Sequence, residues 1–174
     1  MKREDLLDLN DVLQHPGRTL AVDISSDMEF VEDLDLITPL EGTLEAVSTG
    51  NLLLLTGDFK TRAVMECVRC GSPVEVDIEF EIDEQFKVEG TPSAYSSQDM
   101  AKVVDDEPYP LFEENSLMVE ELLRQDLILA LPPHPDCPPG TPTCVSVDER
   151  IASINADEGR PEFQNLSRLL NKDG

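Results

Sequence analysis

Four cysteines have the residue type and spacing that bind metal ions. Cys67 and Cys70 are separated by two residues and followed by Gly71. A Cys-x-x-Cys-Gly turn between two strands is typical of a zinc knuckle, because the glycine relieves crowding and backbone N–H groups can point at the thiolates. Cys137 and Cys144 are separated by six residues, a wider gap than the usual spacing of about two to four.

The second cysteine pair needs a bend in the chain to reach the first. The proline-rich stretch 136–142 can supply that bend, and His134 is a further nitrogen ligand beside it. We therefore predict a tetrahedral Zn²⁺ site, and two pairs of ordinary thiols are the alternative. Its ligands would be Cys67, Cys70, Cys137 and Cys144. A thioredoxin-like redox pair fits less well, because a helix follows the cysteines in that motif, whereas a strand follows here.

The strand after the cysteine turn alternates between apolar and acidic residues. Its apolar residues are Val74, Val76, Ile78, Phe80 and Ile82. Its acidic residues, which we name the acidic ladder, are Glu75, Asp77, Glu79, Glu81 and Asp83. A period of two predicts a half-buried β-strand. Because same-face residues lie ~6.6 Å apart along a strand, the five carboxylates form a continuous negative row on its outer face.

Basic residues are few, and some of them lie close to this strand. Lys60 and Arg62 are on the preceding strand, and Arg69 is at the tip of the cysteine turn. We expect Lys60 and Arg62 to pair with the acidic ladder across strands, each pair contributing ~0.2–1 kcal/mol. The functional alternative is that Arg69 contacts a phosphate or an acidic partner.

The remaining pattern predicts further strands and a covering helix. Strands are expected at 18–25, 40–48, 51–59 and 60–67, with a hairpin turn at Gly50 and a bulge or bend at Gly57-Asp58. Asn115 or Ser116 can cap a helix that ends near Ala130 and covers the sheet. Short helices are expected at 4–14 and 163–170, a mobile acidic loop at 88–110, and a proline-rich loop at 132–147.

These elements predict an α+β fold. We expect an antiparallel β-meander or partly open barrel covered by one central helix, with short terminal helices and a long acidic loop. The chain is expected to form a single domain, 1–174, with its core at about 18–147, the mobile loop at about 88–110 and a C-terminal tail or helix at 148–174.

The chain is strongly acidic. It has 13 lysines and arginines against 37 aspartates and glutamates, a formal net charge of −24. This charge repels phosphate backbones, so we expect no direct RNA binding without a partner. The same field attracts basic proteins, whereas the alternative is that it only keeps the protein soluble. Because no signal-peptide pattern and no run of ~18 apolar residues is present, we expect a cytoplasmic protein without membrane contact and with reduced cysteines.

Catalysis finds little support in the sequence. His15 and His134 stand beside prolines in polar stretches, without the arrangement of side chains that makes a nucleophilic site. Glycine-rich phosphate loops are absent. We therefore expect neither an enzyme nor a small-molecule substrate.

Several of these features together resemble the YceD family, the large ribosomal RNA subunit accumulation proteins. The resemblance rests on Cys67-x-Arg69-Cys70 between two strands, the acidic loop, the helix end from Asp126 to Pro132, the Pro135-x-Cys137 element and the final segment from Phe163 to Leu170. It spans about residue 42 to the end of the chain. Cys144, which follows a proline-rich stretch rather than a tight cysteine cluster, departs from many members of the family.

The resemblance implies a non-enzymatic factor of bacteria or plastids that acts in the synthesis, processing or stability of 23S rRNA. A net charge of −24 disfavours direct binding to rRNA, because the protein and the phosphates repel each other. Our hypothesis is that the protein acts through a basic ribosomal protein or another assembly factor, which would bind the acidic ladder and the acidic loop at 88–110. The alternative is a zinc- or thiol-dependent redox or metal-binding protein that uses Cys67 and Cys70.

Overall fold

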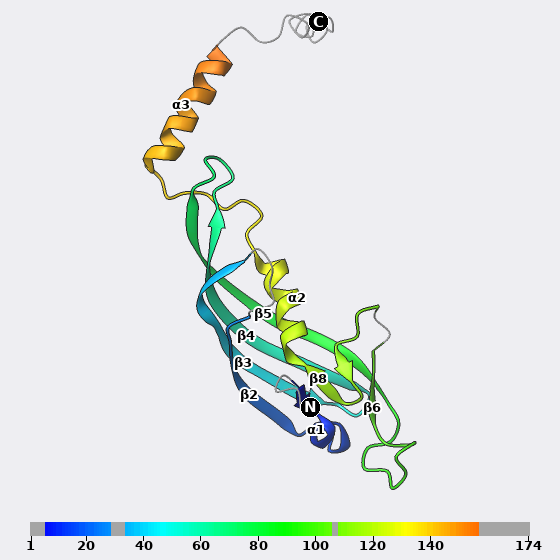
Figure 1. Ribbon diagram of the computed structural model, residues 1–174. Coiled ribbons are helices and arrows are strands. Elements are labelled where there is room, and N and C mark those ends of the chain that lie inside the picture. Colours follow the sequence, from blue (N-terminus) through cyan, green and yellow to red (C-terminus); the bar gives the residue numbers. More distant parts are fainter. Residues whose placement is uncertain (1–5, 29–33, 106–107, 157–174) are drawn as a thin grey trace, which may run out of the picture. The chain divides into compact units, whose positions relative to one another are not determined.

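The computed structural model describes residues 6–28, 34–105 and 108–156 (Figure 1). Its elements are β1 (Leu6–Asp8), α1 (Asn10–Gln14), β2 (Thr19–Ser26), β3 (Asp35–Ser48), β4 (Leu52–Glu66), β5 (Pro73–Glu89), β6 (Lys102–Val104), β7 (Phe112–Glu113), β8 (Ser116–Met118), α2 (Val119–Ala130) and α3 (Pro142–Ala156). The described chain folds into two compact units: the first contains residues up to 65 and residues 75–133, and the second contains residues 66–74 and those from 134 onward. The expectation of one domain over 1–174 stays a prediction.

A five-stranded antiparallel sheet dominates the first unit, with the strand order β2-β3-β4-β5-β6. The pairing of β3 with β4 reaches the register Ser48↔Leu53 beside the connecting turn. Gly50 in this turn has a φ of 100°, a left-handed conformation that glycine adopts without a steric penalty. The predicted hairpin is therefore confirmed.

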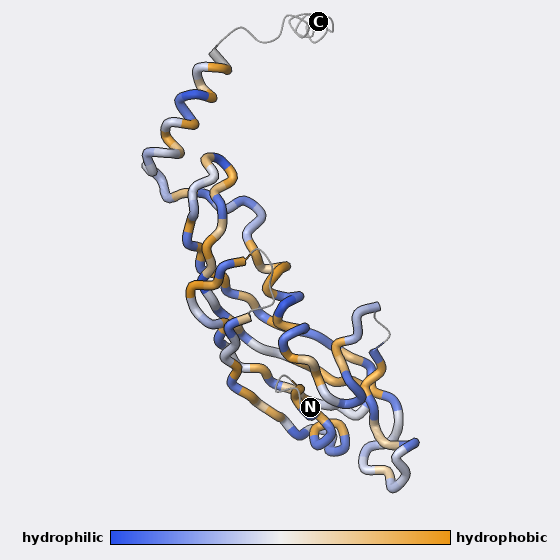
Figure 2. The backbone as a smooth tube through the Cα atoms, viewed as in Figure 1, coloured by the Kyte–Doolittle hydropathy of each residue, from blue (hydrophilic) through white to orange (hydrophobic). Residues whose placement is uncertain are grey.

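The sequence of β5 explains why the sheet has one buried face. Its apolar residues from Val74 to Ile82 are buried or half-buried, whereas all five residues of the acidic ladder are exposed. Figure 2 shows this alternation of hydrophobic and hydrophilic residues along the strands. The predicted half-buried strand with carboxylates outside is confirmed.

The bulge predicted at Gly57-Asp58 is wrong, because β4 runs through this position without interruption. The irregular pairing lies instead in β3, between Leu36 and Glu41. Gly57 makes room for close packing: a Cβ atom there would lie 2.6 Å from the Thr43 carbonyl oxygen and 2.9 Å from the Phe59 ring. The glycine thus permits an aromatic side chain to lie over the strand.

The apolar face of the large sheet packs against several elements. Leu122, Leu123 and Leu127 of α2 are at most 2% exposed and share one core cluster with residues of the sheet, of α1 and of β8. A second, small antiparallel sheet has the order β1-β8-β7. The α+β class is confirmed. The partly open barrel with one central helix is not, because the large sheet ends in two edge strands, β2 and β6, and α1 and β8 share the core with α2.

Part of the range 88–110, which we predicted as a mobile loop, forms strand. β5 continues to Glu89, and β6 pairs with its end from Lys87↔Val104 to Glu89↔Lys102. Side-chain amides from distant elements hold this region: Gln14 Nε2 donates to the Ala101 carbonyl oxygen at 2.9 Å, and Asn115 Nδ2 donates to the same oxygen at 3.0 Å. Contacts between residues so far apart in the chain leave no local pattern in the sequence.

The helices agree with the predictions in part. The covering helix is present as α2, but it begins after β8 and its N-terminus has no side-chain cap from Asn115 or Ser116. α1 lies within the range 4–14 predicted as helical. α3 occupies residues that we predicted as a proline-rich loop up to 147 and as a tail or helix from 148, and the helix predicted at 163–170 lies outside the described residues. Within the described part of the chain, no helix is long and apolar enough to cross a membrane.

Candidate metal centre and acidic surface

The turn between β4 and β5 carries the first two cysteines. The N–H of Cys67 donates to the Ser72 carbonyl oxygen, and the N–H of Gly71 donates to the Cys67 carbonyl oxygen, both at 2.9 Å. Gly71 has a φ of 70°, which favours glycine and lets the turn close between the strands. The predicted arrangement of strand, cysteine turn and strand is therefore confirmed.

A loop and the start of α3 supply the other two cysteines. The N–H of Val68 donates to the Pro135 carbonyl oxygen at 3.0 Å, which fastens the loop to the cysteine turn. The Thr141 hydroxyl donates to the Pro138 carbonyl oxygen at 2.7 Å. α3 then begins at Pro142, a residue that suits the first turn of a helix. Cys144 is placed in this first turn, so the proline-rich stretch makes the bend that the predicted site requires.

The four cysteine sulfurs lie within 4.8 Å of one another. The Sγ–Sγ distance is 3.6 Å for Cys67 and Cys144, 3.6 Å for Cys70 and Cys137, and 3.5 Å for Cys70 and Cys144. These thiols are free, since a disulfide needs ~2.05 Å. In a regular tetrahedron with Zn–S bonds of ~2.3 Å, the sulfurs are ~3.8 Å apart. Three of the six sulfur–sulfur distances are thus close to those of a tetrahedral metal site, and the group is compatible with metal binding.

The second unit has almost no hydrophobic core. In its described part, the buried residues are Cys67, Pro135 and Cys144. Three buried side chains cannot offset the conformational entropy of ordering this segment. His134, expected as a further ligand, is exposed and does not belong to the cysteine group. A metal ion bound by four thiolates would supply the cross-link that this unit otherwise lacks.

The four thiols differ in their affinity for protons. Hydrogen bonds from the Ser72 side chain and backbone lower the pKa of Cys70 to about 5, and a hydrogen bond from the Cys70 backbone lowers the pKa of Cys67. Burial, together with hydrogen bonds to neighbouring sulfurs, raises the pKa of Cys137 and of Cys144. The surroundings thus shift Cys67 and Cys70 toward the thiolate and Cys137 and Cys144 toward the protonated thiol, and a bound divalent cation would displace the protons that remain.

Charged and polar side chains connect the cysteine turn with α3. Arg69 Nη1 lies 3.2 Å from a carboxylate oxygen of Asp148, and Arg69 Nε lies 3.6 Å from one of Asp136. The Ser72 hydroxyl is 3.4 Å from that of Thr143. The sequence reasoning missed these partners, although Ser72 follows the Cys-x-x-Cys-Gly motif directly. Contact of Arg69 with a phosphate or an acidic partner stays a prediction. Such a partner would have to displace the carboxylates of Asp136 and Asp148 from Arg69.

The acidic ladder lies on the outer face of the first unit with little compensation by basic residues. Arg62 Nε donates to Asp77 Oδ1 at 2.6 Å, as predicted, and this hydrogen bond raises the pKa of Arg62. The other four ladder residues have no ion-pair partner in the described part of the chain. No ion pair of Lys60 with the ladder is found among the described residues, although Lys60 lines one hollow with Glu79 and Glu81 and lies opposite Glu41 in the register of β3 and β4.

Neighbouring strands extend this acidic surface. A hollow of about 370 Å³ is lined by Glu45 of β3, Asp58 of β4 and the ladder residues Glu81 and Asp83. Carboxylates from three adjacent strands therefore face the same hollow. We name the ladder together with Glu45 and Asp58 the acidic surface.

The Arg62–Asp77 pair should contribute little to stability. Both side chains are well exposed, 47% and 71%, and exposed ion pairs contribute ~0.2–1 kcal/mol. A double-mutant cycle with Arg62→Gln and Asp77→Asn, measured by urea unfolding, should give a coupling free energy in this range. A coupling above ~2 kcal/mol would mean that the ladder has a structural role, and would make ladder variants unsuitable as functional probes.

Comparisons with known proteins agree with these features. The model of the family described as large ribosomal RNA subunit accumulation protein YceD matches residues 55–170, a range that contains the four cysteines and the acidic ladder. Uncharacterized proteins of Mycobacterium bovis and of two strains of Mycobacterium tuberculosis are each 28% identical over 145 residues. These matches cover 80% of this chain but only 62% of the relatives' own length. No solved structure is detectably similar.

Proposed function

The chain belongs to the YceD family, and on that premise we propose that it is a non-enzymatic factor in the accumulation of 23S rRNA that works in the cytoplasm through a basic partner. The partner would be a ribosomal protein or another assembly factor rich in lysine and arginine. The family description supports the link to large-subunit rRNA, and the chemistry of the exposed surface supports the choice of partner.

The acidic surface is the observation that carries this proposal. Its carboxylates are exposed on adjacent strands, and a single arginine of the chain pairs with the ladder among the described residues. Such a surface repels rRNA phosphates. It attracts basic proteins at long range and would occupy the positive groups that they otherwise place on RNA. The protein would then protect or deliver a basic partner during assembly of the large subunit.

We further propose that the cysteine group binds one Zn²⁺ ion. Four sulfur donors with nearly tetrahedral spacing suit zinc, and four protein ligands leave no open position for a substrate or water. The role of the ion would be structural. It would hold the cysteine turn, the loop from His134 and the first turn of α3 together.

Neutralising the ladder tests the proposed function directly. A fivefold ladder variant carries Glu75→Gln, Asp77→Asn, Glu79→Gln, Glu81→Gln and Asp83→Asn. A matched control removes the same number of exposed carboxylates elsewhere: Asp27→Asn, Asp35→Asn, Asp99→Asn, Glu114→Gln and Glu149→Gln. Because both variants have the same net charge, only the location of the charge differs. We expect the ladder variant to capture about tenfold less ribosomal protein from lysate and to lower 23S rRNA in cells, with capture weakening as ionic strength rises.

The control variant should keep both capture and the 23S rRNA level. Equal capture by the ladder variant and the unmodified protein would remove the proposed role of the ladder. Loss of capture with an unchanged 23S rRNA level would instead separate partner binding from rRNA accumulation.

A further inference from the structure

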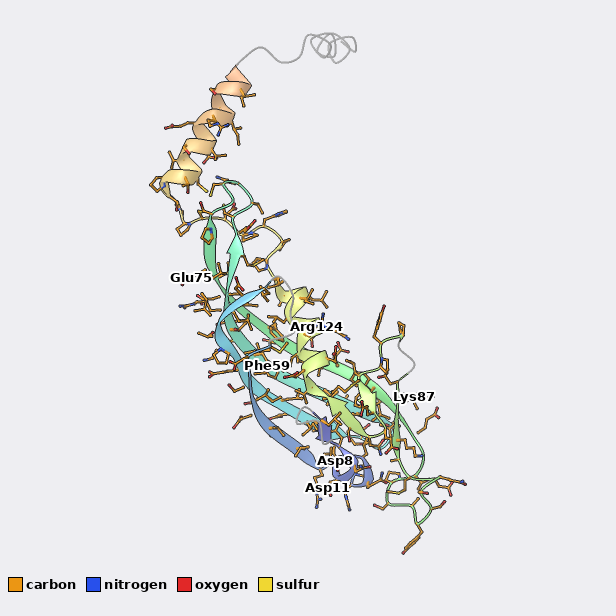
Figure 3. All side chains as sticks on the ribbon, viewed as in Figure 1. Asp8, Asp11, Phe59, Glu75, Lys87 and Arg124 are labelled. Atoms are coloured by element: carbon orange, nitrogen blue, oxygen red, sulfur yellow. The ribbon has the colours of Figure 1, made fainter. Side chains whose placement is uncertain are left out.

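A groove in the first unit lies between α2 and the last part of β5. It has a volume of about 770 Å³ and is lined by Glu84 and Phe86 of β5, by the α2 residues from Glu121 to Leu129 that face it, and by Tyr109. Arg124 of α2 and Lys87 of β5, both labelled in Figure 3, also line it. This volume is in the range of ligand-binding clefts.

The groove exposes an apolar surface. Leu129 is 83% exposed, Tyr109 79% and Ile128 48%. Below them lie the buried Leu122 and the half-buried Phe86, whose ring packs edge-on against Phe112 with centroids 4.8 Å apart. Exposed apolar side chains around one hollow, with packed and buried side chains at its base, are typical of a site that a partner covers.

The groove also contains a carboxylate oxygen without a partner. Asp126 Oδ2 is buried and has no hydrogen-bond partner in the described part of the chain. Burial, with a smaller contribution from the nearby Glu84, raises the pKa of Asp126 to about 6. Asp126 is therefore ionised at neutral pH in a place that disfavours its charge. Because buried polar atoms are nearly always hydrogen-bonded, the unpaired carboxylate oxygen of Asp126 indicates a ligand-binding site.

The charge of the groove selects the kind of ligand. Four acidic residues line it, namely Glu84, Asp105, Glu121 and Asp126, against the basic Lys87 and Arg124. Lys87 already bonds to Glu89 at 2.7 Å. A phosphate or nucleic acid would be repelled. A metal ion is disfavoured too, because the carboxylates of the groove form no group of three or more ligands close enough to hold one, in the described residues.

We propose that this groove binds a basic side chain of a protein partner together with the apolar residues that flank it. An arginine or lysine head group would pair with the Asp126 carboxylate and lie beside Glu84. Its alkyl stem and the flanking residues would cover Leu129, Ile128 and Tyr109. The inference rests on the proposed function for the existence of a basic partner, and it adds a specific anchor distinct from the acidic surface.

A pair of short peptides tests the groove. One is a capped peptide with a single arginine between two leucines, and the other carries citrulline, which is neutral and nearly the same shape, in place of arginine. We expect the arginine peptide to shift the backbone NMR signals of Glu84 to Lys87 and Glu121 to Leu129 in a saturable way. The citrulline peptide should bind about tenfold more weakly.

Two charge-matched variants locate the binding site. Asp126→Asn with Glu84→Gln should weaken binding of the arginine peptide about tenfold, whereas Glu79→Gln with Glu81→Gln, which removes the same charge from the ladder, should leave it within about twofold. Leu129→Ser should weaken binding severalfold, and Tyr95→Ser, an exposed control outside the groove, should not. Circular dichroism of each variant verifies the fold.

Several results would overturn the groove inference. Equal binding of the two peptides would exclude recognition of the cation. Signal shifts spread over the ladder, or equal losses in the two charge-matched variants, would mean that the peptide responds only to net charge. The groove variant could still capture ribosomal proteins while the ladder variant no longer does. That result would contradict the groove proposal but not the proposed function.

Discussion

Replacing Cys67 and Cys144 by serine should abolish zinc binding and disorder the second unit while the first unit stays folded. The protein purified in the presence of zinc should contain one Zn²⁺ ion per chain, and the double variant none, by elemental analysis. Tetrahedral zinc sites depend on all of their ligands, and the two cysteines are the most buried of the four. The described part of this unit has no other core, so removal of the ion should remove most of the free energy that keeps it folded.

The first unit provides an internal reference for this experiment. Its core cluster contains Leu44, Leu123 and Leu127 but none of the cysteines. Hydrogen exchange of backbone amides should therefore become fast in the second unit, for example at Val68 and Val145, and stay slow in β3, β4 and α2. Arg69→Gln is a suitable control, because it removes exposed ion pairs and no ligand, and it should keep the metal.

Thiol labelling separates the zinc site from the redox alternative. If zinc is bound, the four thiols should react slowly in the folded protein and quickly after a chelator is added. Rapid labelling of Cys67 and Cys70 without chelator, in protein that contains no zinc, would contradict the metal centre and favour thiol chemistry.

The sequence was informative where a local pattern determines the structure. Alternation from Val74 to Asp83 specifies a strand with one buried face, and Gly50 and Gly71 mark turns whose backbone suits glycine. The two cysteines of the first turn could be placed for the same reason. The position of Cys144 could not, because it depends on α3 beginning at Pro142, and the polar sequence of α3 carries only a weak helical pattern.

Features created by long-range contacts were missed. β6 is held by Gln14 and Asn115, which lie far from it in the sequence. Gly57 was interpreted as a bulge, because a glycine within a strand pattern does not reveal which ring packs over it. The position of Asp126 in the sequence could have marked it as unusual. It lies four residues after Leu122 and four before Ala130, on the face of α2 that turns toward the sheet. A carboxylate on the inward face of a helix destabilises the fold, so its presence there suggests a role other than packing.

Replacing Asp126 by asparagine should therefore stabilise the protein at neutral pH. The pKa of Asp126 is about 6 in the folded protein against an ordinary aspartate value of 3.8, so the folded state binds more protons than the unfolded state between these values. Stability from this group is accordingly lost as the pH rises through 6. A shift of this size corresponds to at most ~3 kcal/mol, and we expect ~1–2 kcal/mol because water reaches the groove.

The pH dependence distinguishes this effect from a simple gain in packing. In urea unfolding, the stability difference between Asp126→Asn and the unmodified protein should be small near pH 3, should reach about half of its full size at about pH 5 and should be complete above about pH 7. Glu84, Glu121 and Asp105 add negative potential around the site, and Lys87 and Arg124 oppose it. The control Glu121→Gln, an exposed residue of the same helix, should change stability by less than ~0.5 kcal/mol. A difference that does not vary with pH, or a destabilised Asp126→Asn variant, would show that the carboxylate already has a stabilising partner.

A stabilised variant that no longer binds the arginine peptide would reveal what the carboxylate is for. Binding sites often keep charges that the free protein would be more stable without. If Asp126 is such a charge, the free energy lost by burying it is recovered when a cation enters the groove. The arginine peptide should then raise the stability of the unmodified protein, as any ligand of the folded state does, and it should have little effect on Asp126→Asn.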